Sequence, residues 1–185
     1  RLMVKAADVN LRFRDGLPED ALNISDLGRQ TYSEYFSSVY KKADLDAYLA
    51  KYFSVDRVEQ DLKDSEIEYR IAETNSHMVG YAKIGPPCLQ TKQVRENTLQ
   101  LHRLYVRETR QGVGVGGILL SWAIDRARER GAAELCLGVW ANNENAIKLY
   151  ENRGFEAEQV YDIDVGNTRD KELIMSLKFK AKIDA

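Results

Sequence analysis

Four glycines stand immediately before a helical pattern in the second half of the chain. Gly112, Gly114, Gly116 and Gly117 lie within six residues, and the apolar residues that follow recur at helical spacing. Because glycine has no side chain, several backbone N–H groups and the positive end of the helix dipole can approach a phosphate closely there. A turn that needed only flexibility would not require four glycines. The pattern therefore predicts an anion-binding loop, with a pyrophosphate as the expected ligand.

Two familiar phosphate motifs do not account for this loop. Gly112, Gly114 and Gly117 satisfy G-x-G-x-x-G, but a dinucleotide-binding domain needs a tight strand-to-helix turn and several further βα units. Here the loop is entered through residues 107–110, and fewer than 70 residues follow it. No Gly-Lys-Ser/Thr closes the glycine run, which excludes a P-loop.

The elements that position this loop follow from hydrophobic periodicity and turn residues. The helix after the glycines has Leu120, Ala123 or Ile124 and Ala127 on its apolar face and ends at Gly131. Over 99–106 the apolar spacing passes from two residues to three and back, which predicts a bulged strand. We also expect strands at 10–14 and 135–139 and hairpins at 68–74/78–84 and 160–165/173–179. Helices are expected to begin at Pro18, to cover 43–52 and 55–62, and to run from Asn142 or Asn143 to Gly154. The segment between the first two helices, around Tyr32 to Tyr40, is rich in aromatic residues.

Length and composition describe one ordinary globular unit. The 185 residues are 44% apolar and 30% charged, which excludes disordered and fibrous classes. A formal charge of −2 excludes a protein that coats nucleic acid through bulk positive charge. The charge is uneven, however: residues 15–68 carry 13 acidic and 6 basic residues, whereas residues 92–130 carry 8 basic and 4 acidic. Two ligand sides of opposite sign would produce this asymmetry, and so would solvated helix faces.

Cysteine use and hydropathy bear on the cellular setting. Cys88 and Cys136 lie far apart and supply neither a disulfide framework nor a zinc ligand set, which fits a reducing, cytoplasmic protein. The most apolar stretch, residues 113–124, is much shorter than the ~20 residues that span a bilayer, so no membrane partner is expected. Residues 1–5 lack the apolar core of a secretory signal.

Three motifs in sequence resemble the GNAT superfamily of acetyl-CoA-dependent N-acetyltransferases. They are the strand 99–106, the Gln111-x-x-Gly114-x-Gly116 loop with its helix, and the stretch from Asn143 through Tyr150 to Phe155. Within the superfamily, residues 137–147 and Glu172-Leu173-Ile174-Met175 are most similar to the PaiA-type spermidine/spermine acetyltransferases. RimI-type protein N-terminal acetyltransferases share much of the same core pattern.

The resemblance implies an α/β (α+β) fold and a binding mode for acetyl-CoA. A central mixed, mostly antiparallel sheet, flanked by helices, would splay between strands 99–106 and 135–139 and receive the acetyl-pantetheine arm. Residues 1–185 would form a single domain with its acetyl-CoA-binding core at about 98–156. The implied binding residues are Leu104, Tyr105 and Val106 through their backbone, Gln111, Gly112, Val113, Gly114, Val115, Gly116 and Gly117 around the pyrophosphate, and Asn143, Glu144, Asn145 and Tyr150 on the opposite wall. Arg107 and Arg110 would add positive charge for the phosphates, unless they are ordinary surface arginines. No metal is implied, and a homodimer is compatible with the family.

The resemblance also suggests groups for the two proton transfers. Tyr150 matches the family tyrosine that acts as general acid, and a phenol with a pKa near ~10 stays protonated at neutral pH. Many members carry a glutamate on the strand before the loop, but Gln100 and His102 stand there instead. We therefore name His102 as the candidate base, with a packed histidine as the alternative. An acidic residue of the N-terminal half, such as Glu34, acting through water is a further candidate.

Three functions remain open from the sequence. The first is acetylation of a small polyamine, which suits the acidic, aromatic-rich N-terminal half through charge and cation–π attraction. Most of those aromatic residues would nevertheless serve as core. The second function is acetylation of a protein N-terminus or lysine, and the third is non-catalytic binding of acetyl-CoA.

Overall fold

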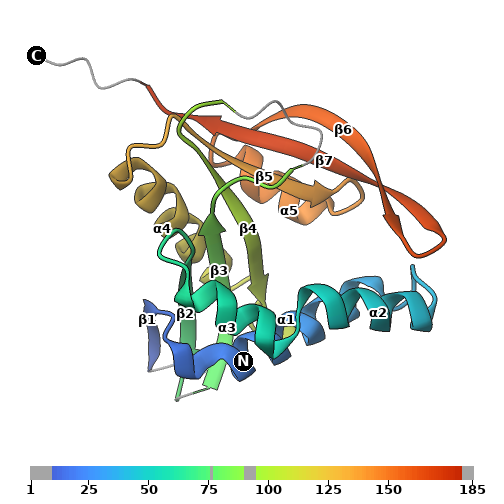
Figure 1. Cartoon of the computed structure of the whole chain (residues 1–185). Coiled ribbons are helices and arrows are strands. Elements are labelled where there is room, and N and C mark those ends of the chain that lie inside the picture. The colour runs from blue at the N-terminus through green and yellow to red at the C-terminus, as the bar shows by residue number, and fades with distance from the viewer. Residues whose placement is uncertain (1–9, 76, 90–94, 181–185) are drawn as a thin grey trace, which may run out of the picture.

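The computed structural model describes residues 10–75, 77–89 and 95–180, which form a seven-stranded sheet with helices on both faces (Figure 1). The elements in chain order are β1 (Leu11–Asp15), α1 (Ala21–Phe36), α2 (Lys42–Tyr52), α3 (Val55–Lys63), β2 (Glu68–Thr74), β3 (His77–Gly85), β4 (Thr98–Val106), α4 (Val115–Glu129), β5 (Glu134–Trp140), α5 (Glu144–Glu151), β6 (Glu156–Val165) and β7 (Thr168–Lys178), with single 3₁₀ turns at Pro18–Asp20 and Glu108–Arg110.

The strand order β1-β2-β3-β4-β5-β7-β6 confirms the mixed, mostly antiparallel sheet. Every pair of neighbours is antiparallel except β4 and β5, which run parallel. That parallel pairing covers only residues 98–100 with 134–136, and the two strands then diverge (Figure 1). The predicted splay between these strands is therefore present.

A bulge in β4 coincides with the start of this divergence. Lys83 of β3 pairs with Arg103 and Ile84 pairs with Leu101, which leaves His102 as an extra residue with no partner on β3. One extra residue bends and twists its strand. The bulge confirms the prediction of a bulged strand that was made from the irregular apolar spacing. It lies two residues after the last β4–β5 pair.

The main apolar core lies on the α4–α5 face of the sheet. Leu119, Leu120, Ala123, Ile124 and Ala127 of α4 are buried there, as the helical periodicity predicted. Two smaller clusters lie on the opposite face, under α1, α2 and α3. Gly131 and Gly154, which follow α4 and α5, both have a positive φ and confirm the predicted helix ends.

The aromatic segment around residues 32–40 differs from the prediction, because most of it belongs to α1 rather than to a connection. Tyr32 stacks on Tyr48 of α2 with ring centroids 4.9 Å apart, and Phe36 stacks on Tyr40 at 5.2 Å. Phe36 also contacts Trp140 of β5 edge-on at 5.2 Å. These aromatic side chains join α1 and α2 to the far side of the divergence between β4 and β5.

The β6–β7 hairpin extends over α2 (Figure 1). Val165 near its tip packs into the cluster formed by Leu45 and Leu49, and the Tyr40 hydroxyl donates to Asp170 Oδ2 at 3.1 Å. The hairpin thus forms a wall facing α2. Within the described part of the chain, no helix is long and apolar enough to cross a membrane.

Candidate active site

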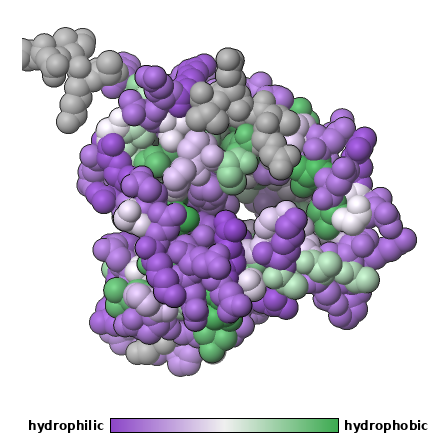
Figure 2. Space-filling view, in the orientation of Figure 1, coloured by the Kyte–Doolittle hydropathy of each residue, from purple (hydrophilic) through white to green (hydrophobic). Residues whose placement is uncertain are grey.

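The gap between β4 and β5 leaves one edge of β4 without a neighbouring strand. Leu104, Tyr105 and Val106 pair with β3 on one side, but the β4–β5 ladder ends before them at Gln100. Backbone groups on such an edge are free to pair with an extended ligand. Figure 2 shows a hollow in the middle of this face, between the β5–β7 side of the sheet and helices α1 and α2.

The glycine loop lies at the end of that free edge. Gln111 Nε2 donates to the backbone oxygen of Val106 at 2.9 Å, which ties the loop to the end of β4. Gly112 and Gly114 have φ of +74° and +94°, and a Cβ added to either would meet nothing within 4 Å. The helix α4 begins directly afterwards, so the N–H groups of its first turn have no partner within the helix. The loop is open and rich in hydrogen-bond donors.

Arg107 makes contacts other than the phosphate contacts that the sequence suggested for it. Arg107 donates to the Met78 backbone oxygen at 2.9 Å and also to the Gln30 side chain, so its guanidinium joins β3 and α1. At the other end of α4, Arg126 pairs with Glu68 and Arg130 with Glu66 and Glu68. The positive charge counted over 92–130 is therefore partly neutralised away from the loop.

Arg153, which the sequence reasoning did not single out, lies beside the loop. Its guanidinium donates to the Ser121 hydroxyl at 2.5 Å and to the Gly117 backbone oxygen at 3.1 Å. It comes from the turn after α5, so only the packing of α5 against α4 brings it there. A positive charge on the first turns of α4 adds to the attraction of the helix N-terminus for phosphate.

The short helix α5 forms the opposite side of the gap. Asn143 is its N-cap, with Oδ1 accepting from the Ala146 N–H at 3.2 Å, and Glu144 and Asn145 are exposed in its first turn. Tyr150 lies two turns further on and is 8% exposed.

Tyr150 is a buried phenol near two others. Burial raises its pKa above the usual value, and nearby Tyr35 of α1 and Tyr105 of β4 interact with it electrostatically. Those two residues belong to α1 and β4, which lie across the gap from α5. At neutral pH this phenol is protonated and can act as a hydrogen-bond donor.

His102 is held by contacts that leave it poorly suited to accept a proton. Nε2 lies 2.8 Å from the Pro86 backbone oxygen, and Nδ1 lies 3.6 Å from Cys88 Sγ. Burial, together with the nearby Lys83 cation, lowers the pKa of His102 to about 4. Its role as base stays a prediction that these contacts do not favour. Gln100 accepts from the Cys88 N–H at 2.8 Å, and Glu34 is exposed on α1, where it accepts from Gln30.

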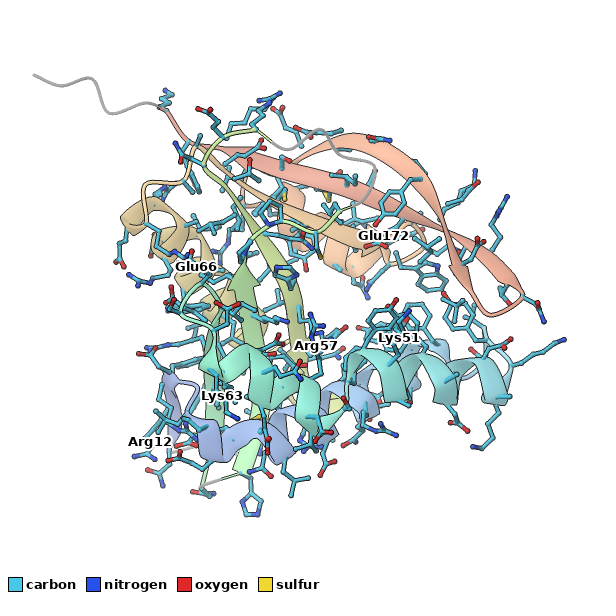
Figure 3. The ribbon with its side chains drawn as sticks, in the orientation of Figure 1. Arg12, Lys51, Arg57, Lys63, Glu66 and Glu172 are labelled. Atoms are coloured by element: carbon cyan, nitrogen blue, oxygen red, sulfur yellow. The ribbon has the colours of Figure 1, made fainter. Side chains whose placement is uncertain are left out.

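A carboxylate not proposed from the sequence lies at the gap instead. Glu172 of β7 points from the sheet toward α1 and α2 (Figure 3), and Tyr161 lies beside it as its pairing partner on β6. The sequence named Glu172 only within the stretch 172–175 that resembles PaiA-type enzymes, without a role. In the structure, residues 168, 170 and 172 share the less exposed face of β7, while 169 and 171 are exposed.

Comparisons with known proteins agree with this geometry. The acetyltransferase (GNAT) family model matches residues 28–155. An uncharacterized N-acetyltransferase from the pepI 3′ region of Lactobacillus delbrueckii subsp. lactis is 26% identical over 149 residues, covering 80% of this chain and 86% of that protein. The PaiA N-acetyltransferase of Thermoplasma acidophilum, solved in complex with coenzyme A, gives a TM-score of 0.75 at 20% identity over 92% of this chain and 100% of its own. The ribosomal-protein-S18-alanine N-acetyltransferase of Escherichia coli gives 0.71 at 20% identity over 95% and 98%.

The family model covers more than half of the chain, so the chain belongs to the GNAT acetyltransferase family. It is an acetyl-CoA-dependent N-acetyltransferase, which sets aside the non-catalytic alternative. That residues 1–185 form one domain stays a prediction.

Proposed function

We propose that this enzyme acetylates a primary amine of a small polycation, such as spermidine or spermine, by direct attack of the amine on the thioester of acetyl-CoA. The observation that carries this proposal is the pair of carboxylates Asp170 and Glu172 on the face of β7 that looks toward α2. Alternate residues of a strand lie about 7 Å apart, which is comparable to the separation of neighbouring nitrogens in a polyamine. None of the ion pairs between described residues neutralises either carboxylate.

Aromatic rings around these carboxylates support a cationic ligand. Tyr48, Trp140 and Tyr161 come from α2, β5 and β6, and the faces of such rings attract ammonium groups. The Trp140 indole N–H is buried without a hydrogen-bond partner among the described residues, so it could donate to a bound ligand. The PaiA-type resemblance points to the same class of acceptor, and a polyamine substrate agrees with a cytoplasmic setting.

We assign acetyl-CoA to the gap and the glycine loop. The free edge of Leu104 to Val106 pairs with the pantetheine arm, and the open donors of residues 111–117 take the pyrophosphate, with Arg153 adding positive charge. Asn143, Glu144 and Asn145 line the opposite side of the arm. In this arrangement the thioester lies near Tyr150.

The reaction requires two proton transfers at one nitrogen. The acceptor ammonium loses one proton, and its lone pair then attacks the thioester carbonyl carbon. The N–C bond forms, the C–S bond breaks, and the leaving thiolate takes a proton from the Tyr150 hydroxyl. The second proton lost by the amine nitrogen restores the phenol, and the products are the acetamide and coenzyme A.

Substitution of Gly114 by alanine tests the assigned pyrophosphate site. Gly114 has φ +94°, and a non-glycine residue in this left-handed region costs about 1–2 kcal/mol. We expect the KM for acetyl-CoA to rise about tenfold, which corresponds to 1.4 kcal/mol, because the loop would relax away from its binding conformation. Gly131→Ala is the matched control, since Gly131 also has a positive φ and open space but lies at the other end of α4. Equal KM values for the two variants would contradict the assignment.

Acceptor specificity is tested by following coenzyme A release with spermidine, spermine, propylamine, a lysine-containing peptide and peptides with free N-termini. We expect turnover of the polyamines. Asp170→Asn should raise the KM for spermidine up to about fivefold, the effect of one partly exposed ion pair, and leave the KM for propylamine unchanged. If peptides turn over and both polyamines do not, the proposal fails and protein acetylation takes its place.

A further inference from the structure

The position of Glu172 is defined by the neighbouring strand β5, over which its side chain lies. β5 and β7 pair Glu172 with Trp140, so both side chains lie on the same face of the sheet. Between them and the last β4–β5 pair lies Gly138, whose missing side chain leaves room for the glutamate. Glu172 Oε1 lies 2.0 Å from the position that a Cβ on Gly138 would occupy. Because Gly138 is two residues beyond Cys136, where pairing with β4 ends, the carboxylate lies at the mouth of the gap.

The surroundings of Glu172 are apolar and aromatic rather than cationic. Burial raises its pKa, while the hydrogen bond from Tyr161 of β6 acts in the opposite direction. The other titratable groups that face this region are the phenols Tyr48 of α2, Tyr40 before α2 and Tyr161 of β6, the carboxylate Asp170 two residues along β7, and Cys88 near Tyr161. The three phenols have raised pKa values and are neutral at physiological pH. The side chain is only partly buried, so a ligand in the gap can reach it.

The other described candidates for the base are less suitable. His102 has both ring nitrogens occupied, Gln100 cannot take up a proton, and Glu34 is exposed on α1. Tyr150 already serves as the donor to the leaving group. Glu172 is a carboxylate that is partly desolvated and lies where β4 and β5 diverge.

We propose that Glu172 is the general base that removes a proton from the acceptor ammonium. This inference rests on the proposed amine acetylation, but it does not depend on which amine is used. The N–H bond of R–NH3+ breaks, the proton moves to the Glu172 carboxylate, and the electron pair remains on nitrogen for attack on the thioester. The carboxylic acid then returns its proton to solvent through the open side of the hollow. Trp140 and Tyr48 hold the ammonium near the carboxylate.

The test is the pH dependence of kcat/KM for the acceptor in Glu172→Gln. The amide has nearly the same shape as the carboxylate, so acetyl-CoA binding measured by titration calorimetry should be unchanged. At pH 7 we expect kcat/KM to fall by about 10²–10⁴-fold, the effect of losing a general base. The wild-type profile should rise through the pKa of Glu172 and then level off. In the variant only the free amine can react, so its kcat/KM should rise tenfold per pH unit toward the amine pKa near ~10 and approach the wild-type value there.

Two comparisons separate this role from the alternatives. Asp170→Asn, two residues away on the same face of β7, should raise the KM for a polyamine and so lower kcat/KM by the same factor at every pH, which leaves a level plateau like that of the wild type. Glu172→Asp should also keep the plateau at a reduced rate, and it serves as the second variant if the glutamine variant fails to fold. A wild-type profile for Glu172→Gln, or a loss that is equal at every pH, would overturn the proposal. The profiles are recorded with whichever amine the wild type acetylates, so failure with polyamines would leave this result interpretable.

Discussion

Replacing Tyr150 by phenylalanine is expected to lower kcat by about 10²–10⁴-fold, the usual effect of removing a general acid. The ring packs in the main core against Phe155, with centroids 5.7 Å apart, and phenylalanine retains that packing. Only the hydroxyl is lost, and with it the proposed donor to the leaving thiolate. Because we assign acetyl-CoA binding to the β4 edge and the glycine loop, the KM for acetyl-CoA should change little.

Steady-state kinetics with the acceptor in excess measure this effect. Tyr69→Phe is the matched control, because Tyr69 is also a buried phenol but lies on the opposite face of the sheet, where it donates to Asp61 at 2.8 Å. Its removal should leave kcat near the wild-type value. An unchanged kcat for Tyr150→Phe would remove this tyrosine from the mechanism.

Replacing Asp61 by alanine is expected to reduce the free energy of unfolding by about 3–5 kcal/mol. Asp61 of α3 lies 2.5 Å from Lys83 Nζ of β3, and the two side chains are only 3% and 6% exposed. Tyr69 donates to the same carboxylate. Removing Asp61 leaves a buried ammonium without its counter-ion, which costs far more than the pair itself contributes. Urea unfolding should show a lower midpoint with little change in slope.

An exposed ion pair with the same separation provides the control. Lys42 Nζ and Asp46 Oδ2 are also 2.5 Å apart, but their side chains are 86% and 57% exposed. Asp46→Ala should change stability by no more than about 0.5 kcal/mol, as for other i,i+4 surface pairs. If the two alanine variants lose similar stability, burial is not what makes the Asp61 pair important.

The stabilisation by Asp61 also has a predictable pH dependence. Lys83 and Tyr69 hold the pKa of Asp61 below its usual range in the folded protein. Its contribution is therefore fully present above the unfolded pKa of about 3.9 and is lost as the pH falls through the lower folded value. The difference in the free energy of unfolding between wild type and Asp61→Ala, measured by urea unfolding, should therefore shrink as the pH falls through this acidic range.

Much of the cofactor side of the site could be predicted from the sequence because its signals are local. Four glycines before an apolar stripe at helical spacing indicate a loop and a helix within about twenty residues, and both are present at 111–129. The irregular spacing at 99–106 likewise predicted a bulged strand, and the structure places the bulge at His102. Such features depend on the conformations that neighbouring residues can adopt, so no distant part of the chain is needed to infer them.

The side of the gap that we assign to the acceptor could not be predicted in the same way. Glu172 reaches the gap only because β7 pairs with β5 and because Gly138 has no side chain to block it. Arg153 reaches the glycine loop only through the packing of α5 against α4. His102 was a reasonable candidate from residue type alone, but its contacts with Pro86 and Cys88 depend on how the loop after β3 folds back.

The sequence by itself determined the order of the elements, the bulged strand, the glycine loop before α4 and the position of Tyr150 on a short helix. Each follows from short-range periodicity, glycine conformation or a match of adjacent residues. Tertiary structure alone decided which carboxylate faces the gap and which groups contact the ring nitrogens of His102. Those outcomes depend on strand register and on desolvation, and both are set by residues far apart in the chain.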